Sequence, residues 1–372
     1  MILNRKVYKT SKTNQYIKSF ENTSMTHQIT LQPSGNTYTA KAYETVLESA
    51  INEGINIPYG CRNGTCGSCK GSILSGEVDY GDYAESALSD VEKSAGKALF
   101  CCARPLSDLI LECREMNIDF VPTRIIPARV ERKEQLSHDV MALFLKLPSS
   151  QSLQFKAGQY IEFLLKDGKR RAFSLANPPH IDGLLELHLR LIPGGQFTEY
   201  VFNEMPDKAI MRIEAPFGSF YLRNDSDKPI IMVAGGTGFA PIKGIIEHML
   251  HHNMNREITL YWGARSLADL YMLALPESWS AAYPHIKFIP VLSDASVEDN
   301  WHGRTGYVHQ AVLNDFADGL AEYEVYCCGA PGMVEVAHSS FLQAGLAEDA
   351  FFSDAFSYAK PVVTPIPVAA EA

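Results

Sequence analysis

The stretch YGCRNGTCGSCKG, residues 59–71, places three cysteines in one short loop that also holds four glycines. The cysteines are Cys61, Cys66 and Cys69, and almost no side chain around them is large enough to bury a thiol. Thiols gathered in this way indicate metal or redox chemistry rather than part of a hydrophobic core. A metal bound by this loop needs a fourth ligand, which has to come from another part of the chain.

The spacing of the three cysteines, C-x4-C-x2-C, is that of plant-type [2Fe–2S] clusters, which take their last cysteine from a distant position. Structural zinc is the alternative, but zinc sites usually show two C-x2-C pairs, and only Cys66 and Cys69 form one here. Glycines with positive φ would let backbone amides approach the cluster sulfurs and help to set the reduction potential. The four glycines are Gly60, Gly64, Gly67 and Gly71.

The fourth ligand is predicted in residues 98–105, ALFCCARP, an apolar run that we expect to return as a strand beside the loop. Either Cys101 or Cys102 could serve. Plant-type ferredoxins place three residues between the last ligand and a proline, and Cys101 stands at this distance from Pro105. We therefore predict Cys101 as the fourth ligand. Cys113, farther along, is expected to be a buried small hydrophobe.

The surroundings of the loop predict a small mixed domain. Residues 29–40 indicate two short strands around a turn. Thr45 and Glu48 form a capping box at the start of a helix that Gly54 would end. A hairpin, a helix and then a cluster loop resemble the ferredoxin β-grasp domain, here over residues 25–115.

Length and composition limit the possible functions. A chain of 372 residues is too long for one ordinary core and predicts two or three domains. A net charge of -10 without a basic stripe excludes nucleic acid as an expected partner, and no apolar run of about 18 residues predicts a membrane span. Residues 1–24 lack a secretory signal and are interpreted as a tail. Clustered cysteines without such a signal favour a reducing, cytoplasmic location.

Residues 116–124 contain Pro122, show little periodicity and are predicted to be a linker. Residues 125–227 then form strand-like segments that predict an all-β domain. One motif stands out there, RAFS at 171–174. Its arginine can pair with a phosphate, its aromatic ring can lie against a planar ring, and its serine can reach a ring nitrogen. A surface arginine on a half-buried strand is the alternative reading.

A second motif in this region is LRLIPGGQFT, residues 189–198. Paired glycines followed by a threonine near a helix start form an anion-binding site from backbone amides and the helix dipole. A hairpin turn with an N-cap threonine explains the same letters.

Residues 228–358 predict a doubly wound α/β domain. A buried strand from Ile230 to Val233 leads into GGTG at 235–238 and then into a helix, with Pro241 at its N1 position. A strand, a glycine loop and a helix in this order form a phosphate cradle at the carboxyl end of a parallel strand. The loop does not have the ordinary G-x-G-x-x-G dinucleotide pattern.

Taken together, these motifs resemble the ferredoxin–NAD(P)H reductase superfamily, in the arrangement with an N-terminal plant-type [2Fe–2S] domain. The resemblance covers residues 26–358 and is strongest to oxygenase reductase components and CDP-6-deoxy-glucoseen reductase-like proteins. It implies a multidomain fold: a ferredoxin β-grasp, an antiparallel flavin-binding β-barrel and a doubly wound parallel-sheet nucleotide domain.

The resemblance also implies site residues. Arg171 would hold a flavin phosphate, Phe173 would stack on the isoalloxazine, and Ser174 would act near flavin N5. The remaining predicted contacts line the flavin diphosphate (Leu189, Gly195, Thr198), the pyridine-nucleotide pyrophosphate (Gly235, Gly236, Thr237, Gly238) and the nicotinamide (Cys328, Gly329).

At the C-terminus, FFSDAFSY at 351–358 resembles the aromatic motif that closes over the flavin, with Phe356 as the expected contact. The chain departs from the family pattern in two ways. A tail, residues 359–372, extends past the usual aromatic terminus, and phenylalanine stands at position 173 where tyrosine is usual.

The three modules would form one electron path to a partner oxygenase, hydroxylase or deoxysugar dehydratase. Nicotinamide gives up two electrons as a hydride and an iron–sulfur cluster takes one at a time, so flavin must stand between them. The protein is thus expected to be an NAD(P)H-dependent iron–sulfur flavoprotein oxidoreductase, with Ser174 and Cys328 as its catalytic residues and no general acid–base pair. Alternatives are a free flavin or ferric reductase, and a non-catalytic redox sensor or electron carrier.

Two further features concern specificity. Arg265 and Ser266 could reach the 2′-phosphate of NADPH, but a second basic residue is missing and Asp269 would repel it, so NADH is predicted and NADPH remains possible. Between Gly76 and Glu92 six residues are acidic and none is basic. This stretch is interpreted either as a solvated face or as a docking patch for a basic partner.

Overall fold

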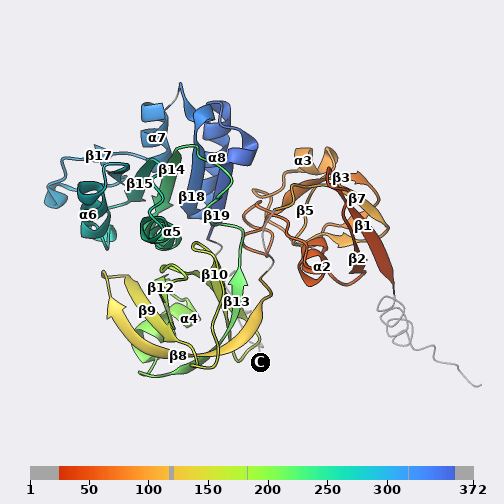
Figure 1. Cartoon of the computed structure of the whole chain (residues 1–372), viewed down its shortest axis with the longest axis horizontal. Helices are drawn as coiled ribbons and strands as arrows, with labels where there is room; N and C mark the ends of the chain where they lie inside the picture. The colour runs from red at the N-terminus through yellow and green to blue at the C-terminus, as the bar shows by residue number, and fades with distance from the viewer. Residues whose placement is uncertain (1–24, 117–120, 182, 317, 357–372) are drawn as a thin grey trace, which may run out of the picture.

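The computed structural model describes residues 25–116, 121–181, 183–316 and 318–356. These residues form three units (Figure 1): an N-terminal unit at 25–116, a middle unit at 121–227 and a C-terminal unit at 228–356. The predicted tails at 1–24 and 359–372 lie outside the described residues. So do residues 117–120 of the predicted linker.

The N-terminal unit is a five-stranded sheet of order β2-β1-β7-β3-β5, with a separate β4-β6 pair. The predicted hairpin is confirmed, because β1 and β2 pair in antiparallel register. The predicted helix is also confirmed: Thr45 and Glu48 form a capping box at its start. The elements are β1 Thr26–Gln32, β2 Thr37–Lys41, α2 Val46–Asn52, β3 Lys70–Ser75, β4 Val78–Asp79, α3 Asp90–Ser94, β5 Lys97–Leu99, β6 Arg104–Pro105 and β7 Leu109–Glu112.

The middle unit is a six-stranded antiparallel sheet of order β11-β10-β13-β8-β9-β12. An antiparallel bridge between Leu175 and Leu187 joins its two edges, so the sheet closes on itself around a core of leucine, isoleucine and phenylalanine. The elements are β8 Arg124–Gln135, β9 Val140–Lys146, β10 Tyr160–Leu164, β11 Arg170–Ser174, β12 Leu184–Arg190, α4 Gln196–Glu199, the π-helical turn η1 Tyr200–Glu204 and β13 Ile210–Phe217.

The C-terminal unit is a six-stranded sheet of order β17-β16-β15-β14-β18-β19, with parallel pairing throughout. One hydrophobic cluster packs α5 and α6 on one face, and a second packs α7 and α8 on the other. The elements are β14 Ile230–Gly235, η2 Gly236–Gly238, α5 Phe239–His251, β15 Ile258–Ala264, η3 Leu267–Asp269, α6 Ala274–Ala282, β16 Ile286–Leu292, η4 Val297–Asp299, β17 Arg304–Thr305, α7 Val308–Phe316, η5 Leu320–Glu322, β18 Glu324–Gly329, α8 Pro331–Gln343, η6 Glu348–Ala350 and β19 Phe351–Ala355.

The start of α5 differs from the prediction. Pro241 is the third residue of the helix and not its first, because Gly236–Gly238 form a 3-10 turn and the α-helix begins at Phe239. Proline at the third helical position breaks no hydrogen bond of the helix, since the first four N–H groups of an α-helix have no intrahelical partner.

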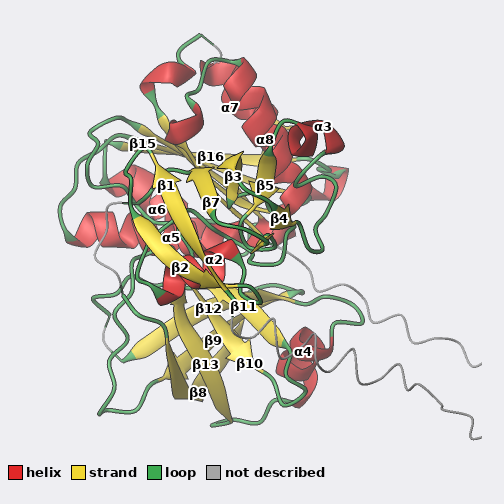
Figure 2. Ribbon diagram, turned by 90° about the vertical axis from the view of Figure 1, so that its right-hand side faces the viewer, coloured by secondary structure: helices red, strands yellow, loops and turns green. Residues whose placement is uncertain are grey.

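Figure 2 shows the N-terminal unit in front of the other two, with the helices of the C-terminal unit above the strands of the middle unit. The middle and C-terminal units are packed tightly. Lys243 of α5 donates from Nζ to Ala176 O at 3.0 Å and pairs with Glu186 at 3.0 Å, and both groups lie across the boundary. Within the described ranges, no helix is long and apolar enough to cross a membrane.

Candidate functional site

The cysteine loop surrounds its sulfur atoms with backbone amides. Cys61 N donates to Cys66 Sγ at 3.3 Å, and Thr65 N donates to Cys61 Sγ at 3.4 Å. On the returning segment, Cys101 N donates to Cys69 Sγ at 3.4 Å. Amides pointing at sulfur stabilise thiolates and iron–sulfur clusters, so the donor set and its surroundings fit a [2Fe–2S] cluster.

Cys101 and Cys102 have different neighbours. The Cys101 thiol is in hydrogen-bonding contact with Cys61 and Cys69, and its pKa is raised by Cys102 first and then by these two groups. The Cys102 sulfur instead lies against Gly64, where an added Cβ would stand 2.7 Å from it. The two sulfurs are 3.7 Å apart, and it is the Cys101 thiol that contacts two cysteines of the loop.

The four loop glycines have two different roles, which corrects the prediction that all use positive φ. Gly64 and Gly67 have φ of 75° and 77°. Gly60 and Gly71 do not, and space explains them instead. A Cβ at Gly71 would stand 2.4 Å from the Phe100 ring, and one at Gly60 would stand 3.2 Å from Cys66 Sγ.

The residues just before Cys61 attach the loop to the middle unit. Tyr160 Oη donates to Gly60 O at 2.8 Å. Ser219 N and Oγ donate to Tyr59 O at 3.1 and 2.7 Å. Most of these bonds involve main-chain atoms of the loop, so the loop's backbone shape determines how the two units fit together.

Arg62, which follows Cys61, adds a side-chain contact across the same boundary. Its guanidinium lies 4.5 Å from the Phe217 ring centroid, and its Nη1 is 3.5 Å from Glu162 Oε2. Glu162 also pairs with Arg170 at 2.8 Å, so one carboxylate of the middle unit joins the loop to β11. The cysteine loop is thereby held against the strand that carries the RAFS motif.

Ser174 and Cys328, the two predicted catalytic residues, meet through a residue that the sequence analysis missed. Ser174 Oγ donates to Asp354 Oδ2 at 3.2 Å. Asp354 is the β19 partner of Cys328 on β18, and all three side chains are buried. A single aspartate in a C-terminal strand matches no short motif, so only the pairing of β18 with β19 reveals it.

Asp354 also connects this site to the cysteine loop. Burial raises the pKa of its carboxyl from 3.8 to about 6, the Ser174 hydrogen bond opposes this rise, and the negative charge of the Cys61 thiolate adds to it. Burial likewise raises the pKa of the Cys328 thiol, which therefore stays protonated at neutral pH. A serine, a carboxyl and a thiol are thus gathered at one place, and a cysteine of the N-terminal loop acts on the carboxyl electrostatically.

Arg171 leaves its guanidinium available. Its Nη1 donates to Arg170 O at 2.8 Å, and it forms no ion pair within the part of the chain that the structure describes. A half-exposed arginine without a carboxylate partner suits a phosphate of FAD. Phe173 follows Arg171 by two positions and therefore lies on the same face of the strand, partly exposed. Its ring centroid is 5.9 Å from that of Phe163 and 5.6 Å from that of Phe197.

The three residues of the second motif serve the local fold as well. The Leu189 side chain is fully buried in the core of the middle unit, so only its backbone can face a ligand. Thr198 Oγ1 accepts from Ile192 N at 3.1 Å, which makes it a brace of the turn rather than an N-cap. Gly195 occupies the N-cap of the four-residue helix α4.

The GGTG loop has the shape of a phosphate cradle. A Cβ at Gly238 would stand 2.1 Å from Cys328 O, so this position can only be glycine without moving β18. Gly236 has a φ of 53°, and Thr237 completes the turn that leads into α5. Amides at the start of a 13-residue helix attract an anion, and the missing side chains let it approach closely.

Arg190 is a second residue that the sequence analysis missed. Its guanidinium lies 3.5 Å from the position of a Cβ at Gly236. Its Nη2 is buried and finds no hydrogen-bond acceptor among the described residues, although Nε is 3.4 Å from Asp139. An unsatisfied buried guanidinium over the loop is what a bound diphosphate would require. The signal was present in the LRLIPGG motif, where it was read as strand.

The remaining predicted contacts lie around the same loop. Phe356 N donates to Gly329 O at 2.8 Å, which brings the C-terminal aromatic beside the Cys328–Gly329 segment. Arg265 is exposed, with Nε 3.9 Å from Asp269. Asp269 is buried and accepts hydrogen bonds from Ser266 N and Oγ at 3.1 and 3.0 Å, so Ser266 is occupied by its own cap.

Comparison with known proteins agrees with the division into three units. Three family models match: a 2Fe-2S iron-sulfur cluster binding domain over residues 29–106, an oxidoreductase FAD-binding domain over 127–221 and an oxidoreductase NAD-binding domain over 232–339. The chain is 38% identical, over 89% of its length and 99% of the relative, to the CDP-6-deoxy-L-threo-D-glycero-4-hexulose-3-dehydrase reductase of Yersinia pestis.

Two further similarities extend the range. The reductase component of a phenol 2-monooxygenase from Pseudomonas is 34% identical over 89% of this chain and 95% of its own length. The crystal structure of an Amycolatopsis cytochrome P450 reductase superposes with a TM-score of 0.73 at 33% identity, covering 89% of this chain and 99% of that one.

Proposed function

This chain belongs to the family of NAD(P)H-dependent iron–sulfur flavoprotein reductases that join 2Fe-2S, FAD-binding and NAD-binding domains, and on that premise we propose that it supplies electrons to a partner enzyme. The proposed path runs from NADH through FAD and a [2Fe–2S] cluster to that partner. When bound, FAD accepts two electrons from the nicotinamide and releases them one at a time, as the cluster requires. The chain itself binds, orients and shields these groups.

The observation that carries the proposal is the junction around Asp354. Ser174 of the middle unit donates to this carboxyl, Cys328 of the C-terminal unit is its partner on the neighbouring strand, and Cys61 of the N-terminal unit is near enough to raise its pKa. A flavin placed here by Arg171 and Ser174 would have the nicotinamide segment on one side and the cluster loop on the other. Electron transfer between the groups needs this proximity and no other catalytic side chain.

For the cluster we propose Cys61, Cys66, Cys69 and Cys101 as ligands. The contacts of the Cys101 thiol with Cys61 and Cys69 support the fourth assignment, because Cys102 is turned toward Gly64. The amides of Thr65 and Cys101 would donate to the ligand sulfurs.

For the organic cofactors we propose that Arg171 holds an FAD phosphate, that Phe173 and Phe356 contact the flavin ring, and that Ser174 lies near N5. The glycines at 235–238 with Thr237 would hold the NADH diphosphate, with Arg190 above it. Arg190 supports this placement because its buried guanidinium has an unsatisfied nitrogen there. Leu189, Gly195 and Thr198 would shape the wall of the flavin site through their backbone and turn.

NADH is the proposed donor. Ligand atoms of Asp139 and Asp269 lie within 4.8 Å of each other near Arg265, and two carboxylates there would repel a 2′-phosphate. Asp139 is already 3.4 Å from Nε of Arg190, so Arg265 has to offset Asp269 before it can attract a 2′-phosphate. A higher kcat/KM for NADPH than for NADH would refute this choice.

We further propose a domain division at 25–115, 125–227 and 228–358, with 116–124 as a linker, and cytoplasm as the location. The finer fold classes would be a ferredoxin β-grasp, an antiparallel flavin-binding β-barrel and a doubly wound nucleotide domain. The closed antiparallel sheet and the parallel sheet covered by helices on both faces support the last two.

The partner is proposed to be an oxygenase, hydroxylase or deoxysugar dehydratase, because the relatives are named as reductases of such enzymes. The test separates this role from that of a free flavin reductase. Cytochrome c reduction by NADH, which takes single electrons, is compared in the wild type, Cys101→Ser and the matched control Cys102→Ser. We expect iron and cytochrome c activity to be lost only in Cys101→Ser, while ferricyanide reduction by NADH persists. Full cytochrome c activity without the cluster would contradict the proposed path.

A further inference from the structure

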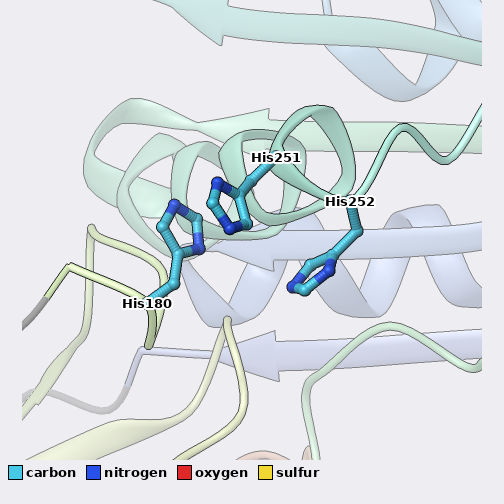
Figure 3. Close-up of side chains that lie close together, drawn as sticks. All are labelled: His180, His251 and His252. Carbon is cyan, nitrogen blue, oxygen red and sulfur yellow. The ribbon is translucent and has the colours of Figure 1, made fainter.

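Histidines from two units meet on the surface at the far end of α5. His180 lies in the loop between β11 and β12 of the middle unit, while His248 and His251 belong to α5 and His252 is its C-cap. Figure 3 shows the rings of His180 and His251 facing each other, with His252 beside them. The ring centroids of His180 and His251 are 3.6 Å apart, and those of His251 and His252 are 4.9 Å apart.

This cluster differs from the other histidine contacts of the molecule in what its nitrogens bind. Nδ1 of His180 and Nδ1 of His248 are buried and have no hydrogen-bond partner within the described ranges. By contrast, both nitrogens of His188 are engaged, with Glu186 at 2.9 Å and Tyr271 at 3.0 Å. Buried polar atoms without partners are uncommon in folded proteins, and a ligand at His180 would supply a partner for one of these two nitrogens.

The ring nitrogens are close enough to bind one ion. One ligand atom from each of His180, His251 and His252 lies within 4.8 Å of the others. Around a tetrahedral ion with metal–nitrogen distances of about 2.1 Å, the nitrogens would be about 3.4 Å apart. The His180 and His251 rings are stacked, with 13° between their planes, so one ring has to turn before both rings point an in-plane nitrogen lone pair at the same ion. His251 and His252 are on the surface, where their side chains can make such a turn.

The chemistry of the donors defines the ion. The three groups are all imidazoles, without a carboxylate or thiolate among them. Imidazole suits zinc, copper and nickel, whereas calcium and magnesium require oxygen ligands. Burial and the neighbouring histidines also lower the pKa of His248 to about 4, and lower that of His180, which leaves both rings neutral at physiological pH.

We propose that His180, His251 and His252 form a site for a divalent transition ion, of the class of Zn²⁺, that joins the middle unit to the C-terminal unit. The site is separate from the three cofactors. It stands at the end of a 13-residue helix whose start faces the glycine loop, about 18 Å away along the helix axis.

A bound ion here would tie together a boundary that is already packed. Three residues before His180, the carbonyl of Asn177 lies 3.3 Å from the position of a Cβ at Gly244 on α5. An ion that binds only the assembled units stabilises their contact by mass action. The expected effect is therefore on binding and stability, and not on the rate of cofactor reduction.

Zinc binding to the holoprotein tests the proposal. Protein with its full iron and flavin content, checked by absorption, is dialysed to equilibrium with Zn²⁺, and total zinc and iron are measured. We expect one zinc per chain, bound at least tenfold more weakly by His180→Ala and by His251→Ala. His302→Ala is the matched control, because it removes an exposed histidine from the same C-terminal unit, and it should bind like the wild type.

Two results of the zinc measurement would overturn the proposal. One is the absence of stoichiometric zinc in the wild type. The other is unchanged affinity in His180→Ala, which would restrict the ion to the i, i+3 and i, i+4 histidines of α5. Electron paramagnetic resonance of Cu²⁺ bound to the oxidised protein gives an independent measurement. Hyperfine structure from three nitrogens in the wild type, and fewer in His180→Ala, supports the site, and identical spectra refute it.

Discussion

Ser174 and Asp354 stand 180 positions apart in the chain, yet one hydrogen bond of 3.2 Å joins them. The carboxyl lies in the interior, where its charged form is disfavoured, and the hydroxyl is its direct partner. At the residue scale, the protonation of Asp354 therefore depends on two opposing effects: burial, which raises its pKa, and the Ser174 hydrogen bond, which lowers it.

Substitutions in the RAFS motif should separate binding from reactivity. We expect Arg171→Ala to lose most of its FAD on gel filtration, because the substitution removes the guanidinium that is proposed to bind an FAD phosphate. Ser174→Ala should keep its FAD but reduce it by NADH roughly 100-fold more slowly, since a donor at the reacting atom is removed. Stopped-flow absorption and flavin content measure the two effects. Lys169→Ala, which removes a half-exposed cation paired with Asp167 just before the same strand, serves as the control. Full flavin retention by Arg171→Ala would refute its role.

Asp354 makes a pH-dependent contribution to stability. Its pKa is raised from 3.8 in the unfolded chain to about 6 in the fold, so the folded state binds more protons between these values and stability falls as pH rises through this window. The full shift corresponds to about 3 kcal/mol, of which about 2 kcal/mol is lost between pH 4 and pH 7. When the pH is raised from 4 to 7, the free energy of unfolding of the wild type should therefore fall by about this much relative to that of Asp354→Asn.

Urea unfolding followed by tryptophan fluorescence measures this difference, because Trp262, Trp279 and Trp301 all lie in the C-terminal unit with Asp354. The comparison of the two proteins cancels the other titrating groups. A constant difference from pH 4 to pH 7 would mean that the carboxyl is not desolvated in solution.

What the sequence could predict at this scale depended on local spacing. The three loop cysteines and the RAFS letters lie within a few residues of each other, so their meaning is readable from the chain. Asp354 and Arg190 are single residues whose partners come from other strands, and their roles appear only when β18 meets β19 or when β12 lies over the glycine loop.

At the scale of elements, β14, the glycine loop at 235–238 and α5 together form the phosphate cradle. The strand ends at Gly235, the chain turns through Gly236–Gly238, and the helix carries its positive end toward the turn. The close approach of Gly238 to Cys328 O ties this turn to β18.

A side chain at Gly238 should disrupt this cradle. Gly238→Ala places a Cβ at 2.1 Å from a backbone oxygen that cannot rotate away, so β18 has to move. We expect KM for NADH to rise at least tenfold and the protein to lose about 2 kcal/mol of stability. Gly332→Ala is the matched control: it lies in the first turn of α8 with open space around it, and alanine there should be neutral or stabilising. Equal KM values in the two variants would contradict the prediction.

Element boundaries followed local rules where a local bond decides them. The capping box at Thr45 and Glu48 predicts the start of α2 correctly, because both bonds form within one turn. The start of α5 was misplaced by two residues, because the 3-10 turn at Gly236–Gly238 forms against β18 and not within the helix. Packing between distant elements cannot be read from the residues that flank a proline.

At the scale of the whole molecule, the acidic stretch between Gly76 and Glu92 lies over the cluster loop. Ala84 N donates to Gly64 O at 2.9 Å. Two of its six carboxylates have local cationic partners, since Glu92 pairs with Lys70 at 2.6 Å and Asp79 is 4.0 Å from Arg104. Asp82 and Glu85 are exposed and form no ion pair in the part of the chain that the structure describes.

If these charges guide a basic partner, electron transfer to that partner should slow as salt rises. We expect a decrease of roughly tenfold between low and high ionic strength, while flavin reduction by NADH changes little. Asp82→Lys combined with Glu85→Lys should reduce only transfer to the partner. The control, Asp294→Lys with Glu298→Lys, makes the same change in net charge on exposed positions of the C-terminal unit. Rates that do not depend on salt would assign the stretch to a solvated face.

The attachment of the cysteine loop through Tyr59 and Gly60 has a consequence for how the molecule behaves when iron is scarce. The groups that Tyr160 and Ser219 hold are main-chain atoms directly before the first cysteine. Because metal binding and folding are coupled, we expect a cluster on the proposed ligands to fix the positions of these atoms. Without iron, the contact between the N-terminal and middle units should therefore weaken, and the molecule should become less compact in solution. Its hydrodynamic radius would then report whether it had been supplied with iron, before any enzyme assay was run.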